Sequence, residues 1–349
     1  MTHAPESRSL PGSFPGAGGK GMDEGAGVGV GMFGGLLPEV REVVRREAPR
    51  DWPELRRVLG PVADHPLGPR PTLPLAACAA VGGDPRAARE VAATWEVVAQ
   101  AGGILDDLQD GDRSGLGARV GPGRAFNFSA ALLAYGALLL SRAPLPPLRV
   151  LALQREFHRE TLHLLAGQDL DLTGKTATLD DYWATITGKT ARAFAWACGA
   201  GARCGTEDPA AVDACRGFGL HLGLALQVLD DLQGIWEPVG RGDLHAGKVT
   251  LPLLYGLEMD HPGREELQEM VRERRLPEEA GRVVELLDAI GTREFLVWTA
   301  IQERERSLAA LAPLRTVGDP HHSGVEALVD YATMILRHAG GIAGMEATP

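Results

Sequence analysis

The chain has 349 residues, of which 44% are hydrophobic and 23% are charged, so it can form one large globular domain or two ordinary ones. The formal net charge of −11 argues against a nucleic-acid-binding protein, whose binding surface is basic. The four cysteines form no Cys-x-x-Cys pair, which argues against a disulfide-rich fold and favours a reducing, cytoplasmic setting.

Residues 1–36 are rich in Gly, Pro and Ser, and we expect a disordered tail because they bury too little apolar surface to offset the entropy of ordering. From residue 37 onward, apolar residues recur at helical spacing. The helices expected in chain order cover 36–48, 85–105, 129–140, 147–168, 179–202, 212–232, 293–311 and 324–340. Several are apolar on most faces, which is typical of the interior of a large bundle. We therefore predict a single all-α domain over 37–345.

The longest apolar stretch, 129–140, has the length of a buried core helix and is too short to cross a bilayer. The N-terminus lacks a basic segment followed by an apolar core. We expect neither a membrane span nor a signal peptide.

Two acidic clusters share the string Leu-Asp-Asp-Leu-Gln. The first contains Asp106, Asp107 and Asp110, and the second contains Asp230 and Asp231. An apolar helical pattern runs into each cluster, so the carboxylates are expected near helix C-terminal ends. There the helix dipole disfavours each negative charge by about 0.3–1 kcal/mol. Asp106 and Asp110 also share one helix face and repel each other.

A multivalent cation would compensate for this repulsion. Mg²⁺ prefers hard oxygen ligands, commonly one or two carboxylates together with substrate phosphates. Neither cluster contains His or Cys, which disfavours zinc. Phosphates would need cationic neighbours, and the candidates are Lys189, Arg241 and Lys248. Each of these can equally be a solvated surface charge, and solvated or capping aspartates remain the alternative to a metal site.

Five segments carry a family resemblance. They are "DDLQD" (106–110), "GQDLDL" (167–172), "GKT" (188–190), "LGLALQVLDDLQG" (222–234) and "GDLHAGKVTLPLLYGLE" (242–258). With these motifs in this order, the chain resembles the trans-isoprenyl diphosphate synthases, or polyprenyl synthetase family, over about 60–340. The resemblance implies an all-α isoprenoid synthase fold with a deep central cavity, and a homodimer.

The resemblance also assigns roles to individual residues. Asp106 and Asp110 would bind two Mg²⁺ ions and Asp230 a third, with support from Asp107 and Asp231. The residues that would contact the allylic diphosphate substrate are Gln168, Lys189, Thr190, Gln227 and Lys248.

Three positions depart from the family pattern. No lysine stands before Arg70, and the Arg-Arg pair after the first cluster is missing, although Arg113 and Arg119 are present. These two elements normally hold isopentenyl diphosphate, so Arg70 and Arg113 are the remaining candidates for that role. Gly234 stands where many members have a third aspartate in the second cluster.

In the family, the residues four and five positions before the first cluster form the floor of the chain tunnel. Here they are Gly102 and Ala101, which are small, and the floor is expected to be open. Val98 and Trp95 lie one or more helical turns deeper, and Trp95 either closes the tunnel or is ordinary core. If it closes the tunnel, chains of about twenty carbons would fit.

These features lead to three hypotheses. The first is Mg²⁺-dependent prenyl transfer from an allylic diphosphate of about 15 to 20 carbons to an acceptor that need not be isopentenyl diphosphate. Relatives with a shortened loop that prenylate a peptide also resemble this chain around "DDLQDGD". The second is a terpene cyclase on the same fold. The third is a non-catalytic partner of a true synthase, which the intact carboxylates and lysines argue against.

Overall fold

A computed structural model describes residues 32–111, 114–173, 178–236, 242–314 and 322–342. Within these ranges all regular structure is helical, as predicted. The elements are η1 (Gly34–Leu36), α1 (Leu37–Glu47), α2 (Pro53–Ala63), α3 (Thr72–Ala80), η2 (Pro85–Ala88), α4 (Arg89–Gln109), α5 (Leu116–Val120), α6 (Pro122–Leu140), α7 (Pro147–Leu172), α8 (Leu179–Ile186), η3 (Thr187–Ala191), α9 (Arg192–Gly205), α10 (Pro209–Trp236), α11 (Gly242–His245), α12 (Leu251–Glu258), α13 (Arg264–Arg272), α14 (Ala280–Ala289), α15 (Thr292–Ala310), η4 (Ala312–Leu314) and α16 (His322–Ile342).

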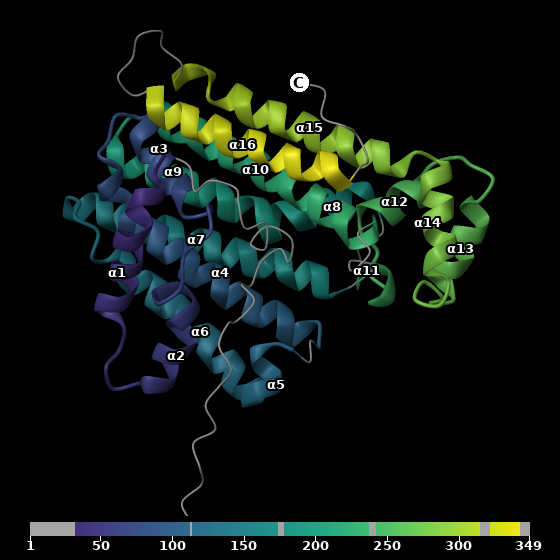
Figure 1. Ribbon diagram of the computed structural model, residues 1–349, viewed down its shortest axis with the longest axis horizontal. Coiled ribbons are helices and arrows are strands. Elements are labelled where there is room, and N and C mark those ends of the chain that lie inside the picture. The colour runs from purple at the N-terminus through teal and green to yellow at the C-terminus, as the bar shows by residue number, and fades with distance from the viewer. Residues whose placement is uncertain (1–31, 112–113, 174–177, 237–241, 315–321, 343–349) are drawn as a thin grey trace, which may run out of the picture.

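The long helices form a bundle whose axes lie roughly along the long axis of the molecule (Figure 1). Because short connections join them, successive long helices run in opposite directions. As a result, α4, α7 and α10 all end at the side of the bundle where α11 lies (Figure 1).

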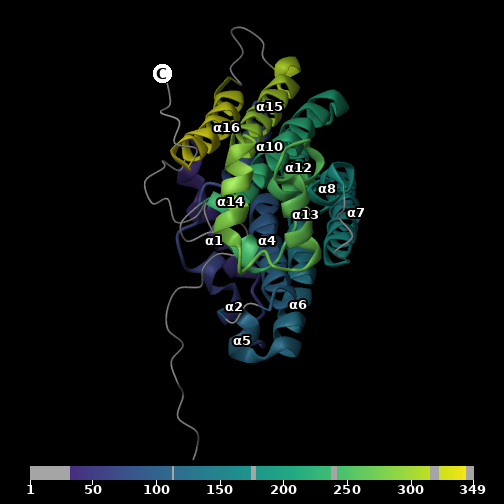
Figure 2. The same ribbon diagram turned by 90° about the vertical axis from the view of Figure 1, so that its right-hand side faces the viewer.

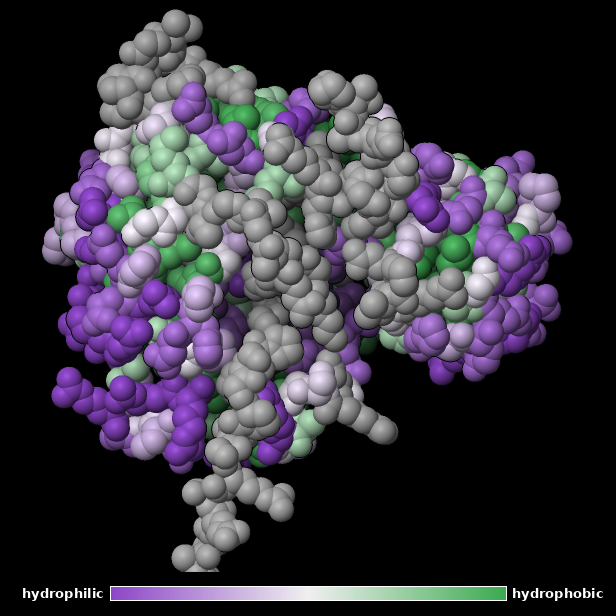
Figure 3. All heavy atoms as spheres, in the orientation of Figure 1, coloured by the Kyte–Doolittle hydropathy of each residue, from purple (hydrophilic) through white to green (hydrophobic). Residues whose placement is uncertain are grey.

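Two apolar cores stabilise this arrangement. The main core fills the bundle, and it includes every residue of α3 except Thr72, Pro74 and Ala79. A smaller core, which includes Leu253, Leu267 and Leu287, holds α12, α13 and α14 together as a lobe at one end (Figures 1 and 2). Hydrophilic residues cover most of the visible outer surface of this lobe (Figure 3). Helices that are apolar on most faces are thus interior helices, as the sequence indicated.

Four expected boundaries are corrected. Of the expected tail, 1–36, residues 1–31 lie outside the described part of the chain. The last three residues, Gly34–Leu36, form a 3-10 turn in which Leu36 is buried, so the ordered domain begins earlier than expected. The segment 179–202 is not one helix, because the π turn η3 separates α8 from α9. The second acidic cluster does not end its helix, since α10 continues to Trp236.

The fourth correction concerns α6. It begins at Pro122, before the apolar stretch at 129–140, and has 19 residues. Among the described helices it alone is long and apolar enough to cross a bilayer, by length and composition. However, it packs its inner face, including Leu132, Tyr135 and Leu139, into the protein core, and core helices of soluble proteins meet the same criterion.

Candidate active site

Carboxylates gather where α4, α7 and α10 end. Asp106 lies in the last turn of α4 and Asp110 directly follows that helix, as predicted from the sequence. Asp171 lies in the last turn of α7, and Asp230 lies near the end of α10. The C-termini of α4 and α7 therefore add their negative dipole ends to Asp106, Asp110 and Asp171, which favours a cation at this place.

The π turn η3 carries Lys189 into this acidic region. A Cβ atom on Gly167 of α7 would lie 2.8 Å from the Cα of Gly188, so glycine allows the backbones of α7 and η3 to touch. Gly188 and the backbone nitrogen of Lys189 make this contact, so the π turn holds Lys189 beside α7.

Both lysines that the sequence singled out are paired with these carboxylates. Lys189 Nζ lies 2.8 Å from Asp171 Oδ2 and 3.8 Å from Asp106 Oδ1. Lys248 Nζ lies 2.8 Å from Asp110 Oδ2. Burial acts to lower the pKa of Lys189, but Asp106 and Asp171 outweigh it and the pKa is raised, so this lysine is charged. Neither lysine is an isolated surface charge.

The two aspartates of the second cluster have different surroundings. Asp230 is exposed to solvent, whereas Asp231 is buried with 3% of its surface exposed. Asp231 Oδ1 accepts a hydrogen bond from Gln227 Nε2 (3.1 Å), and Oδ2 accepts one from the backbone N–H of Leu251 (3.1 Å). Asp231 therefore acts as a cap for the N-terminus of α12 and is a positioning residue.

A chain of hydrogen bonds extends from Asp231 to η3. The hydroxyl of Thr190 donates to Gln227 Oε1 (2.8 Å), and Gln227 in turn donates to Asp231. Thr190 and Gln227, both predicted to contact substrate, thus link η3 to α10. The buried Tyr182 of α8 also faces Asp231, and nothing in the sequence signalled this contact.

Burial and mutual repulsion raise the pKa values of the acidic groups. For Asp106 burial is the main cause, and Asp110 adds to it, while Lys189 opposes both. Burial, then Asp243, raises the pKa of Asp230 to about 6, although Lys189 and Lys248 oppose the shift. Burial raises the pKa of Asp231 to about 7, while the nearby Tyr182 hydroxyl and the hydrogen bond from Gln227 oppose the shift. Asp230 is open to water on one side yet crowded by protein on the others.

This set of groups fits Mg²⁺. The available ligands are the carboxylate oxygens of Asp106, Asp110, Asp171 and Asp230, which are the hard oxygen donors that Mg²⁺ prefers. In the part of the chain that the structure describes, no three acidic, His or Cys side chains form a ready metal cage. Ions held between one or two carboxylates and a diphosphate match this arrangement.

Other predicted residues lie around this centre. Gln168 Nε2 donates to Gln109 Oε1 (2.6 Å) and so connects the ends of α7 and α4. Asp107 packs against Gly115, where a Cβ would lie 2.7 Å from its Oδ2. Arg113 and Arg241 lie outside the described residues.

Arg70 is not brought to the carboxylates. Its guanidinium pairs with the buried carboxylate of Glu96 (2.8 Å) and lies over the ring of Trp95 (5.9 Å). Glu96 precedes Asp106 by ten residues, about 15 Å along α4. The guanidinium of Arg70 is thus engaged by Glu96 and Trp95, away from the carboxylates.

The two residues predicted to form the tunnel floor differ in exposure, Gly102 being exposed and Ala101 buried. Gly102 has open space where a side chain would begin, but Ala101 is fully buried and does not line that space. Trp95 is buried with 3% exposed, and its ring meets Phe194 edge-on at 5.1 Å. Both the tunnel-closing and the core interpretations of Trp95 remain compatible with this packing.

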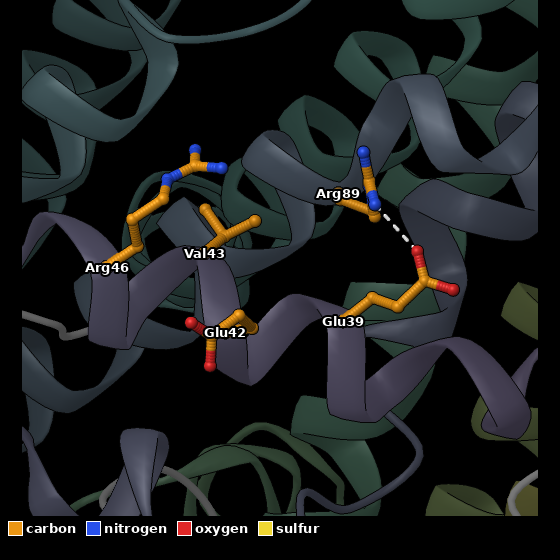
Figure 4. A pocket seen from close by; sticks show the side chains of 5 residues that line it. All are labelled: Glu39, Glu42, Val43, Arg46 and Arg89. Carbon is orange, nitrogen blue, oxygen red and sulfur yellow. Dashed lines mark hydrogen bonds and ion pairs between the residues drawn. The ribbon is translucent and has the colours of Figure 1, made fainter.

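A small hollow at the other end of α4 is unrelated to the carboxylates. It is lined by Glu39, Glu42, Val43, Arg46 and Arg89 (Figure 4). Its charges are largely paired, because Arg89 binds Glu39 (2.6 Å) and Arg46 lies 3.3 Å from Glu47. Arg89 precedes Asp106 by 17 residues, about 25 Å along the helix.

Comparison with known proteins decides the family. Residues 68–290, well over half of the chain, match the sequence family described as polyprenyl synthetase. The chain belongs to the polyprenyl synthetase family. The sequence resemblance is thereby confirmed, and members of this family are enzymes that transfer prenyl groups.

Among curated relatives, a geranylgeranyl diphosphate synthase of Mycobacterium tuberculosis is 36% identical over 203 residues, which are 54% of this chain and 57% of that protein. The chain thus matches little more than half the length of that relative. An octaprenyl diphosphate synthase of Escherichia coli is 30% identical over 269 residues, covering 70% of this chain and 79% of that protein.

Solved structures of this family share the fold. A geranylgeranyl pyrophosphate synthetase from Pyrococcus horikoshii has a TM-score of 0.77 at 22% identity, covering 88% of this chain and 96% of that one. A polyprenyl synthase from Caulobacter crescentus, solved with calcium and isoprenyl diphosphate, has a TM-score of 0.75 at 24% identity over 88% of this chain and 96% of that one.

Proposed function

We propose that this polyprenyl synthetase family member is a Mg²⁺-dependent enzyme that ionises an allylic isoprenoid diphosphate and transfers its prenyl group. The observation that carries the proposal is the meeting of Asp106, Asp110, Asp171 and Asp230 with two paired lysines from separate elements. Asp106, Asp110 and Asp230 would hold the metal, three ions in all if the family pattern applies.

The lysines would change partners when substrate binds. In the free protein Lys189 and Lys248 neutralise carboxylates. With metal and diphosphate present, the same ammonium groups can donate to the diphosphate oxygens, which are stronger acceptors because they carry more charge. When bound, Mg²⁺ supplies Lewis-acid stabilisation of the charge that builds on the departing diphosphate.

The reaction needs no protein nucleophile. The allylic C–O bond breaks with both electrons going to the diphosphate, and the hydrocarbon chain is left as a delocalised cation. Aromatic faces can stabilise such a cation. Phe194, five residues after Lys189, is partly buried against the main core and offers such a face. Asp231 stays buried and keeps α12, and with it the segment that carries Lys248, in place.

The proposed chain length of the substrate rests on the helix that carries the first cluster. Gly102 lies one turn from Asp106 and faces open space, whereas Trp95 lies eleven residues away. Eleven residues span about 16 Å of helix, which corresponds to an allylic chain of about 15 to 20 carbons.

The residues expected to bind the acceptor depart from the family pattern. Binding a second diphosphate tightly requires several convergent cationic donors. Arg70, one of the cationic donors expected there, is paired with Glu96, and no lysine precedes it in the sequence. This favours an acceptor other than isopentenyl diphosphate, or an intramolecular reaction as in a terpene cyclase, which is the second candidate function.

One incubation separates these functions. The full chain is mixed with Mg²⁺ and geranylgeranyl diphosphate, with and without isopentenyl diphosphate, and products and released diphosphate are measured. Longer diphosphates formed only with isopentenyl diphosphate indicate elongation, and a hydrocarbon formed without it indicates a cyclase. If diphosphate stays intact in both tubes across farnesyl and geranylgeranyl substrates, an ionising enzyme acting alone is ruled out in favour of a missing acceptor or a non-catalytic subunit.

A homodimer is part of the proposal. Only three of the 26 residues of α7, namely Leu153, Phe157 and Gly167, are buried. The outer side of α7 exposes Leu148 (81%) and Leu162 (69%). The neighbouring α6 also exposes Phe126 and Leu138, and α7 forms an edge of the molecule in Figure 2. Light scattering should report a dimer, and Leu162→Glu should dissociate it, because burying an unpaired carboxylate in an apolar interface is costly. A cytoplasmic setting remains the expectation.

A further inference from the structure

Three aromatic rings form a stack on the outside of the molecule, where α12 packs against α15 (Figure 1). The ring centroids of Tyr255 and Phe295 lie 4.0 Å apart, and those of Phe295 and Trp298 lie 6.5 Å apart. Tyr255 and Phe295 are half-buried, whereas Trp298 exposes 58% of its surface. The stack therefore begins at the contact between the two helices and ends at a tryptophan that faces solvent.

The exposure of Trp298 differs from that of every other tryptophan in this chain. The remaining five tryptophans are buried or half-buried. The stack also belongs to α12 and α15, whereas the proposed homodimer uses the outer face of α6 and α7. Tryptophan, tyrosine and arginine carry much of the binding energy in protein interfaces. An exposed ring at the end of a packed stack is therefore suited to bind a partner.

Carboxylates lie beside the stack on both helices. Glu294 precedes Trp298 by four residues and Glu258 follows Tyr255 by three, so each carboxylate shares a helix face with a ring. Because helical side chains lean toward the N-terminus of their helix, the ring of Trp298 lies over the turn that carries Glu294. Both glutamates are exposed, and no Lys or Arg among the described residues forms an ion pair with either of them.

The neighbouring cation is engaged elsewhere. Arg293 pairs with Asp288 (3.1 Å) and lies over the ring of Trp236 (5.2 Å). Glu258 accepts a hydrogen bond from the backbone N–H of Leu179 (3.1 Å), which holds its side chain in place without neutralising its charge. The surface thus combines aromatic rings with uncompensated negative charge.

We propose that this surface, made of the three rings and the two glutamates, docks an arginine-bearing segment of a partner polypeptide. A guanidinium group stacks on an aromatic face and donates paired hydrogen bonds to a carboxylate. An apolar segment would bury the carboxylates without a partner, and an acidic segment would be repelled. The net charge of −11 also favours the approach of a basic partner. None of these five residues belongs to the carboxylate site, so the inference does not depend on the proposed function.

The test measures the fluorescence anisotropy of a labelled peptide of alternating arginine and serine residues, titrated with the full chain at physiological salt. Trp298→Ala should raise the Kd by about tenfold or more, because it removes the stacking face. Glu294→Gln should raise it by about 3- to 10-fold, since the paired hydrogen bonds lose their charge. Trp298→Phe keeps a ring and should stay within a few-fold of the wild type. A peptide with lysine in place of arginine should bind a few-fold more weakly, and one with uncharged citrulline more weakly still.

Two matched controls complete the design. Met32→Ala removes an apolar side chain that is also 58% exposed, and Asp213→Asn removes an exposed carboxylate from α10, so both should bind the peptide as the wild type does. Thermal unfolding verifies that each variant is folded.

Four results would overturn the inference. The first is an unchanged Kd in Trp298→Ala, which would place the peptide elsewhere on the molecule. The second is an equal loss in Asp213→Asn and Glu294→Gln, which would show attraction by net charge alone. The third is equally tight binding of the citrulline peptide, which would indicate an uncharged partner. The fourth is a smaller particle for Trp298→Ala than for the wild type in light scattering, which would show that a second copy of the chain covers this surface.

Discussion

The two copies of Leu-Asp-Asp-Leu-Gln are identical in sequence and differ in structure. In the first copy, at the end of α4, Asp106 and Asp107 are both partly exposed, and Asp107 packs against Gly115. In the second copy, inside α10, Asp230 is exposed while Asp231 is buried and caps α12. The first aspartate of each copy thus faces the proposed metal site, whereas the second aspartate supports a different neighbour in each case.

The difference arises from the path of the chain after each copy. The chain leaves α4 at Gln109, so the side chains around it stay near solvent. After the second copy α10 continues for three more residues to Trp236, and η3, α8 and α12 all approach it. The same residues therefore perform different tasks because different elements surround them.

The largest expected effect comes from removing the first aspartate of either copy. Asp106→Asn and Asp230→Asn should each lower the rate of diphosphate release by about 100-fold or more, because each removes charge that stabilises the departing group. The rate is measured with geranylgeranyl diphosphate and Mg²⁺. A loss confined to one of the two variants would show that the copies do not act on the same diphosphate.

The second aspartates should differ from each other. Asp231→Ala should lower the free energy of unfolding by about 1–3 kcal/mol, since it leaves the buried amide of Leu251 and Nε2 of Gln227 without their acceptor. Asp107→Ala, at a partly exposed position, should cost less than about 1 kcal/mol. Urea unfolding of the metal-free proteins measures both values, and equal losses would contradict the different roles of the two aspartates.

The second copy should also make stability depend on pH. In the unfolded chain an aspartate has a pKa of about 3.9. In the folded protein the pKa of Asp230 is raised to about 6 and that of Asp231 to about 7. The folded state thus binds protons that the unfolded state releases, and this contribution to stability is complete below about pH 4 and is lost as the pH rises to about 7.

The measurement is the urea midpoint between pH 5 and pH 8 in EDTA. The wild-type midpoint should fall with rising pH more steeply than that of Asp231→Asn, which has no proton to lose at this position. Mg²⁺ with diphosphate should reduce the fall, since bound cations favour the ionised carboxylates. A wild-type curve parallel to that of the variant would show that Asp231 is ionised throughout.

The smallest effect concerns chain length at the first copy alone. Gly102→Leu places a side chain in the open space one turn before Asp106 and should shift preference toward shorter allylic diphosphates by a few-fold. Trp95→Ala should shift it toward longer ones if Trp95 closes the tunnel. Both shifts appear in the ratio of kcat/KM for geranylgeranyl and farnesyl diphosphates. An unchanged ratio in Trp95→Ala would leave Trp95 as ordinary core.

The sequence determined the all-α fold class and the helical end at Asp106 and Asp110, because apolar periodicity and acidic repeats are local patterns, and it singled out the two lysines that pair with the carboxylates. Only the tertiary structure decided that Asp231 is buried while Asp230 is exposed, that Asp171 joins Lys189, and that Asp243 lies against Gly234. These relations depend on the close approach of helices distant in sequence. Spacing along the chain does not encode which side of a helix a later segment will cover.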